Sequence, residues 1–157
     1  MKGKRGIALD IGTHTGWAVL YPDGSVESGV CDFSTKRGES RNMKLLRFEN
    51  WADETIGILK PDLVYYELPH HQGGSATMVL VNMAGSIIRA CEKHDIPYAG
   101  IHTGTLKKNT TGHGKASKED MVKEAEKRFP GQKITSDDQA DALLLLSMLM
   151  DILGGRG

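Results

Sequence analysis

The first third of the chain carries short apolar runs with the spacing of β-strands. Residues 5–11, 17–21 and 25–33 form three such runs, and the second is followed by Pro22-Asp23-Gly24, a common turn sequence. Strands joined by turns this short predict an antiparallel meander.

Beyond residue 39 the pattern becomes helical. Apolar residues at helical spacing predict helices over 39–60, 117–129 and 136–153, and the Pro-free apolar segment 75–93 is predicted to be a fourth helix. Ser136 and Gln139 have the spacing of a capping box at the start of the last helix. Two short apolar runs, 63–67 and 98–102, are predicted to be strands, and the polar segment 103–114 a loop.

This order of elements predicts an α/β fold. Strands that alternate with helices after a meander indicate a mixed five-stranded sheet, three strands antiparallel and two parallel, with helices on its faces. A length of 157 residues fits one domain, which we expect to span residues 1–153. The Gly-rich segment 154–157 is expected to be a flexible tail.

Composition indicates a soluble globular protein, with 39% hydrophobic and 25% charged residues. The longest apolar run, 143–150, is well short of the roughly 20 residues that cross a bilayer. The apolar stretch near the N-terminus is too short for a signal peptide. We therefore expect a cytoplasmic protein with no membrane contact, in which Cys31 and Cys91 are reduced thiols.

Charge is balanced overall but clustered locally. The 20 basic and 20 acidic residues cancel, which argues against a protein that simply coats DNA. Segment 96–118 nevertheless has no acidic residue, and it contains Lys107, Lys108, Lys115 and Lys118 together with His102 and His113. A second stretch holds Lys36, Arg37, Arg41, Lys44 and Arg47 against a single acid, Glu39. Both stretches are either solvated faces or surfaces that contact DNA.

Four acidic residues lie in unusually apolar surroundings. Asp10 and Glu67 end apolar strands, and Asp138 and Asp141 begin a helix that continues with Ala and Leu. A spacing of three residues separates the last two by about 60° around the helix, so that both can face one point. Converging carboxylates need a compensating cation, and oxygen-only ligands suit Mg²⁺ or Mn²⁺ better than Zn²⁺.

Each of these acids also has an ordinary structural explanation. Asp10 and Glu67 could simply end strands, and acids at a helix start interact well with the helix dipole. Asp137 lies four residues before Asp141 and could share its face, so spacing alone does not choose between Asp137 and Asp138.

In order along the chain, four motifs resemble the RuvC-like crossover junction endonucleases of bacteria and phages. They are Asp10-Ile-Gly-Thr-His-Thr-Gly-Trp-Ala, the strand ending in Glu67, the lysines from Lys107 to Lys118, and Asp138-Gln-Ala-Asp141-Ala. The resemblance spans nearly the whole chain. It implies a ribonuclease H-like fold, a homodimer, and cutting of four-way (Holliday) DNA junctions with Mg²⁺, which Mn²⁺ can replace, in a bacterial cell or a phage-infected host.

The resemblance also implies roles for individual residues. It assigns catalysis and metal binding to Asp10, Glu67, Asp138 and Asp141, and so favours Asp138 over Asp137. Lys107 and Lys118 match family lysines near the scissile DNA, with Lys108, His113 and Lys115 expected to contact DNA beside them. The expected mechanism is hydrolysis with two metal ions bridged by Asp10, Lys107 or Lys118 stabilising the phosphate, and 5′-phosphate and 3′-hydroxyl products.

One segment departs from the family pattern. After the strand glutamate, bacterial members often carry an aromatic residue thought to wedge into the junction, whereas this chain has Leu68-Pro-His-His-Gln72. His70 or His71 could stack on a base, or both could be ordinary loop residues. A broader activity on branched DNA is therefore an alternative to strict junction selectivity.

The predicted helix 75–93 bears on the homodimer. Its apolar residues surround more than one face, so that one side can pack on the sheet and another on a partner subunit, unless its own chain covers it entirely.

Three other functions fit parts of the sequence. The Asp10–Gly16 segment also resembles the first phosphate loop of actin-like ATPases, although those enzymes need a second domain of similar size. A ribonuclease H acting on RNA–DNA hybrids would use similar carboxylates. A non-catalytic branched-DNA binding protein would gain nothing from four acids near phosphate.

Overall fold

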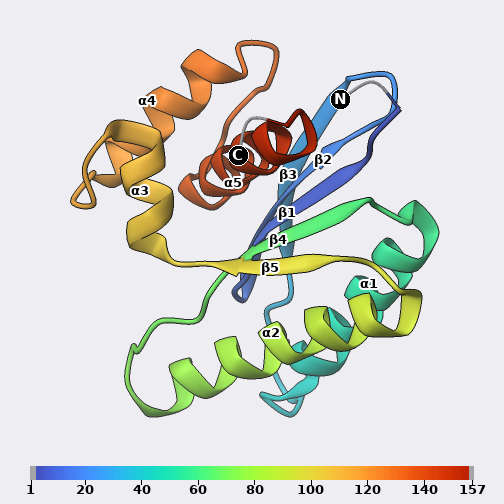
Figure 1. Cartoon of the computed structure of the whole chain (residues 1–157). Helices are drawn as coiled ribbons and strands as arrows, with labels where there is room; N and C mark the ends of the chain where they lie inside the picture. The colour runs from blue at the N-terminus through green and yellow to red at the C-terminus, as the bar shows by residue number, and fades with distance from the viewer. Residues whose placement is uncertain (1–2, 156–157) are drawn as a thin grey trace.

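The computed structural model describes residues 3–155, in which a five-stranded sheet lies between two layers of helices (Figure 1). In chain order the elements are β1 (Gly6–Asp10), β2 (His14–Leu20), β3 (Val26–Asp32), α1 (Met43–Leu59), β4 (Leu63–Glu67), α2 (Gly74–His94), β5 (Tyr98–Ile101), α3 (Thr103–Thr111), α4 (Lys118–Arg128) and α5 (Asp137–Leu153). The strand order is β3-β2-β1-β4-β5. The first three strands are antiparallel, and β4 and β5 are added in parallel. The predicted mixed sheet is confirmed.

The sheet separates two hydrophobic cores, because successive side chains of a strand point to opposite faces. On β1, Ile7 and Leu9 face the layer of α1 and α2, whereas Ala8 faces α5. Figure 1 shows α1 and α2 on one side of the sheet and α3, α4 and α5 on the other. Helix α5 is the central element of its layer, and its residues Leu143 to Leu146 are all 0% exposed.

Helix α2 is long and apolar enough to cross a membrane by length and composition. Much of this apolar character serves the core, since Leu80, Met83 and Ile87 are buried against the sheet and α1. Met78 and Val81 remain exposed on the same helix.

The prediction of a loop over 103–114 is wrong for most of that segment. Thr103–Thr111 forms α3, which ends at Gly112 in a left-handed conformation with φ of 88°. Leu106 and Thr110 are its buried residues. A helix this short, rich in Thr and with so few buried positions, leaves little periodicity in the sequence.

The predicted capping box at α5 forms only in part. The Ser136 hydroxyl accepts a hydrogen bond from the Gln139 N–H at 3.1 Å, as expected. The Gln139 side-chain oxygen instead accepts from the N–H of Thr135, at 2.9 Å, one residue before the cap. A complete capping box is present at α4, between Ser117 and Asp120.

The two cysteines are free thiols, as predicted: Cys91 is buried and Cys31 half-buried. The domain limits and the flexible tail remain predictions. Gly154 and Gly155 form a turn after α5, and residues 156–157 of that tail lie outside the described residues.

Candidate active site

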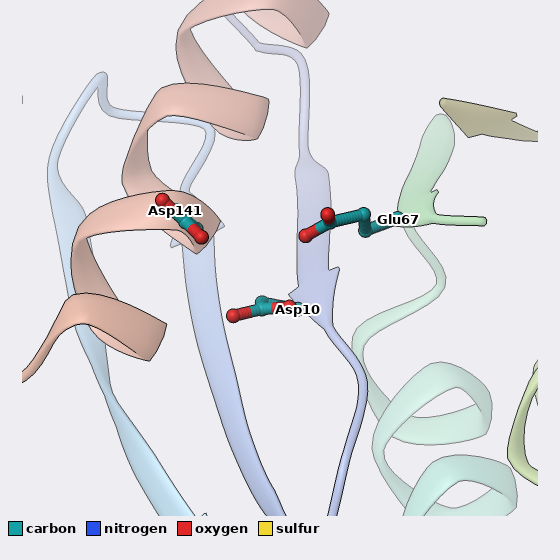
Figure 2. Close-up of side chains that lie close together, drawn as sticks. All are labelled: Asp10, Glu67 and Asp141. Atoms are coloured by element: carbon teal, nitrogen blue, oxygen red, sulfur yellow. The ribbon is translucent and has the colours of Figure 1, made fainter. Parts of the chain in front are cut away.

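The acids of β1 and β4 meet because these strands are parallel neighbours. Leu9 lies beside Tyr66 in the register, so that Asp10 and Glu67 follow at the same edge of the sheet. The first turns of α5 cross this edge and bring Asp141 to it. Figure 2 shows the three carboxylates pointing toward a common space, and one oxygen from each lies within 4.8 Å of the others.

Asp138 and Asp137, adjacent on α5, have different partners. Asp138 is half-buried, so that burial raises its pKa, and its charge in turn raises the pKa of Asp10. Asp137 instead accepts an ion pair from the Lys118 Nζ of α4 at 3.4 Å. Both acids line the cleft and the charges of both raise the pKa of Asp141, whereas Asp138 also raises the pKa of Asp10. The choice of Asp138 over Asp137 as a metal ligand remains a prediction.

Burial and mutual repulsion raise the pKa values of acids in this cluster, so that their protonated forms are favoured. Burial raises the pKa of Asp10 well above its usual value, and the neighbouring charges of Glu67 and Asp141 raise it further. Burial, followed by repulsion from Glu67, raises the pKa of Asp141 to about 7, although Lys107 opposes this shift. Within residues 3–155, no ion pair compensates Asp10, Glu67 or Asp141.

These residues fit a hard divalent cation. All the converging donors are carboxylate oxygens, the ligands that Mg²⁺ and Mn²⁺ prefer. Uncompensated buried negative charge is costly, and a bound cation would remove both the repulsion and the upward pKa shifts.

The acids lie in an open cleft of about 1090 Å³. Its wall includes the turn after β1, the start of α1, the first half of α2, and residues of α3, α4 and α5. The cleft therefore opens at the strand ends and receives side chains from both layers of helices.

Two hydrogen-bonding groups support the acids. The Thr103 hydroxyl, at the start of α3, donates to a Glu67 carboxylate oxygen. Gln139, only 3% exposed, donates from its amide to the Ser28 hydroxyl at 2.9 Å and to the Lys133 carbonyl at 3.0 Å. Gln139 thereby ties the first turn of α5 to β3 and to the loop before the helix.

Comparison with known proteins identifies the family. No family model matches the sequence. The crossover junction endodeoxyribonuclease RuvC of Brachyspira hyodysenteriae is 30% identical over 121 residues, which cover 76% of this chain and 74% of that protein. This chain belongs to the RuvC family. The RuvC of Ruegeria pomeroyi is 27% identical over 145 residues, covering 88% of this chain and 86% of that protein.

A solved structure agrees with this assignment. Thermus thermophilus RuvC in complex with a Holliday junction substrate has a TM-score of 0.77 with this chain, at 20% identity, and the match covers 98% of this chain and 95% of that one. At this identity the likeness shows the RuvC fold. The predicted ribonuclease H-like architecture is therefore confirmed.

The basic residues predicted for this RuvC-family site separate into two groups. Lys107, Lys118 and His70 line the cleft that holds the acids. Lys108, His113, Lys115 and His71 are exposed and do not line it. DNA contact by either group remains a prediction.

Sequence reasoning did not assign Thr103, Arg41 or Lys44 to the site, although all three line the cleft. Thr103 follows β5, whose Ile101 is in register with Glu67, so the parallel pairing of these strands was the available signal. Arg41 and Lys44 belong to the second basic stretch, where the excess of cations over acids was the only signal.

Proposed function

We propose that the protein is a metal-dependent endonuclease that resolves four-way DNA junctions by paired nicks. The observation that carries this proposal is the convergence of Asp10, Glu67 and Asp141, within 4.8 Å, in an open cleft. Membership of the RuvC family supports it, since its curated members are named crossover junction endodeoxyribonucleases.

In this proposal Asp10, Glu67, Asp141 and Asp138 hold two Mg²⁺ ions, with Mn²⁺ as a substitute. Asp10 would be the central ligand, because the charges of Glu67 on β4 and of Asp141 and Asp138 on α5 all raise its pKa. Bound ions of this kind activate an attacking water and stabilise a leaving 3′ oxygen, giving 5′-phosphate and 3′-hydroxyl ends.

The remaining side chains position the substrate and the ligands. Lys107 is close enough to Asp141 to lower its pKa, so its ammonium group can also stabilise charge on a phosphate beside the acids. Thr103 fixes the orientation of Glu67 through its hydrogen bond. His70 lines the cleft after β4, where an imidazole can stack on an unpaired base at the junction.

We further infer a homodimer formed through α2. Val81 of this helix is 52% exposed and does not line the cleft, and the neighbouring Met78, which does line it, is 62% exposed, so α2 carries apolar surface that a partner subunit can cover. A four-way junction has approximate two-fold symmetry, and a dimer with the same symmetry presents two sites to opposed strands. Such a protein would act in the cytoplasm of a bacterial or phage-infected cell.

The test compares labelled four-way junction, linear duplex and RNA–DNA hybrid, each with and without Mg²⁺. The protein should nick the junction symmetrically in Mg²⁺, and Asp10→Asn should abolish nicking while it leaves binding intact. Retained cutting by a clean preparation of Asp10→Asn would remove the proposed reaction centre. Preferred cutting of the hybrid would instead favour a ribonuclease H.

A matched pair of variants tests the ligand assignment on α5. Asp138→Asn and Asp137→Asn make the same chemical change at adjacent positions. Because the charge of Asp138 acts on Asp10, whereas Asp137 is ion-paired with Lys118, we expect the first to lose most cleavage and the second to retain most of it. The reverse order would assign the metal ligand to Asp137.

A further inference from the structure

Two pairs of basic residues enter the cleft from opposite faces of the sheet. Lys107 of α3 and Lys118 of α4 come from the layer that contains α5. Arg41 and Lys44, just before and within the first turn of α1, come from the other layer. The carboxylates of β1, β4 and α5 therefore lie between two cationic rims.

The second rim is held next to the acids by a direct contact. The Lys44 ammonium group lies 3.5 Å from the hydroxyl of Thr13. Thr13 is three residues after Asp10, in the turn that also lines the cleft. Lys44 is half-buried at this position, which keeps its ammonium group close to the turn.

Among the described residues, the positive charges of Arg41 and Lys44 are not neutralised by ion pairs with acidic side chains. In residues 3–155, no ion pair involves Arg41 or Lys44. The acid of this stretch, Glu39, is already paired with Arg47. The first turn of α1 contains no acidic residue, so the positive end of the helix dipole adds to both cations.

We propose that Arg41 and Lys44 bind a DNA backbone phosphate other than the one that is cut, on the strand that crosses the acids. This inference rests on the proposed nuclease function. The acids repel a DNA strand, and Lys107 and Lys118 attract it from one side only. A second pair of cations across the cleft holds the strand on both sides of the scissile phosphate and fixes its direction.

A charge-matched pair of double variants tests the proposal. Arg41→Gln/Lys44→Gln and Lys36→Gln/Arg37→Gln each remove two positive charges from the same stretch, but Lys36 and Arg37 do not line the cleft. Both are made in Asp10→Asn protein, and binding to a fluorescent four-way junction is measured by anisotropy at several salt concentrations. Circular dichroism and thermal unfolding verify folding.

We expect the cleft double variant to bind about tenfold more weakly or worse, and to lower the salt-dependence exponent by about 0.9 for each lost phosphate contact. The control double variant should match the Asp10→Asn protein. If the cleft double variant unfolds, Arg41→Gln alone, with its exposed side chain, is compared with Arg37→Gln in the same way.

Neutral methylphosphonate linkages then locate the contact. Placed one at a time on either side of the cleavage position, one linkage should weaken binding by Asp10→Asn protein but not by the cleft double variant. Equal binding by both double variants, with the same response to every neutral linkage, overturns the proposal. Failure of the Asp10→Asn protein to bind any DNA would instead count against the nuclease function itself.

Discussion

A Cβ atom on Gly16 would lie 2.0 Å from the carbonyl oxygen of Asp138. Gly16 is the β2 residue that pairs with Asp10 across the sheet. The backbone of β2 thus touches the first turn of α5 beside the proposed metal ligands. This close approach sets the separation between the strand of Asp10 and the helix of Asp138 and Asp141.

Gly16→Ala should therefore displace α5 from the sheet. Because the obstructing atom belongs to the backbone, we expect a loss of stability of about 1–3 kcal/mol, typical of overpacking. A misplacement on the order of 1 Å at a reaction centre can cost about a hundredfold in rate, so cleavage should fall more than stability implies. Urea unfolding and single-turnover nicking measure the two effects. Gly131→Ala, where an added Cβ meets nothing within 4 Å, is the control.

The acid cluster should make metal-free stability depend on pH. Asp141 has a folded-state pKa of about 7 against the ordinary 3.8, so between these values the folded protein keeps a proton that the unfolded chain loses. The contribution of Asp141 to stability therefore falls as pH rises toward 7 and is constant above it. Asp141→Asn removes this loss and should also abolish cleavage.

We compare the free energy of unfolding of Asp141→Asn with that of the unmodified protein in chelator. The difference in favour of the variant should increase by about 2 kcal/mol between about pH 5 and pH 8. Urea unfolding at each pH measures it. Glu54→Gln, which neutralises an exposed acid of α1, should show no comparable increase. A gain for Asp141→Asn that is the same at every pH would contradict the raised pKa.

Addition of Mg²⁺ should stabilise the folded protein, because the ion binds the carboxylates only when they are brought together. At about a hundred times Kd the stabilisation is roughly 2.7 kcal/mol, which corresponds to a rise in Tm of about 2–4 °C for each kcal/mol. Asp10→Asn should lose most of this rise. Thermal scans with Mg²⁺, Mn²⁺ and chelator make the comparison, and an equal rise in both proteins would mean that Mg²⁺ binds elsewhere.

Val81→Glu should convert the proposed dimer to monomers, since it places a charge in the apolar contact between two copies of α2. Light scattering coupled to gel filtration measures the mass directly. Ile58→Glu makes a similar change at a residue of α1 that is 71% exposed, and it should leave the mass unchanged. A monomeric unmodified protein at micromolar concentration would refute the dimer.

The strands and the long helices were predictable because each has a strong local pattern. β4, for example, is an apolar run bounded by Pro61-Asp62 and Leu68-Pro69, and it begins and ends at the predicted residues. Helix α3 was not predictable, since Leu106 and Thr110 alone give it a buried side.

The site was predictable where topology alone determines it. Parallel β1 and β4 place Asp10 and Glu67 at one edge whatever the details of packing. Asp137 and Asp138 have different neighbours because of the rotation of α5 about its axis and because Lys118 of another helix pairs with Asp137. Contacts between residues this far apart in the chain cannot be predicted from the local sequence. The same holds for Lys44, which reaches the cleft through the packing of α1.

Helix α1 connects β3 to β4 and α2 connects β4 to β5, and both helices lie on the face of the sheet opposite α5 (Figure 1). The sheet thus separates two helical layers whose sequences can change independently of each other. Substitutions on the outer surfaces of α1 and α2 can therefore accumulate with little effect on the leucines of α5, which are buried on the opposite face. Divergence of this kind is compatible with a preserved reaction centre at low overall sequence identity.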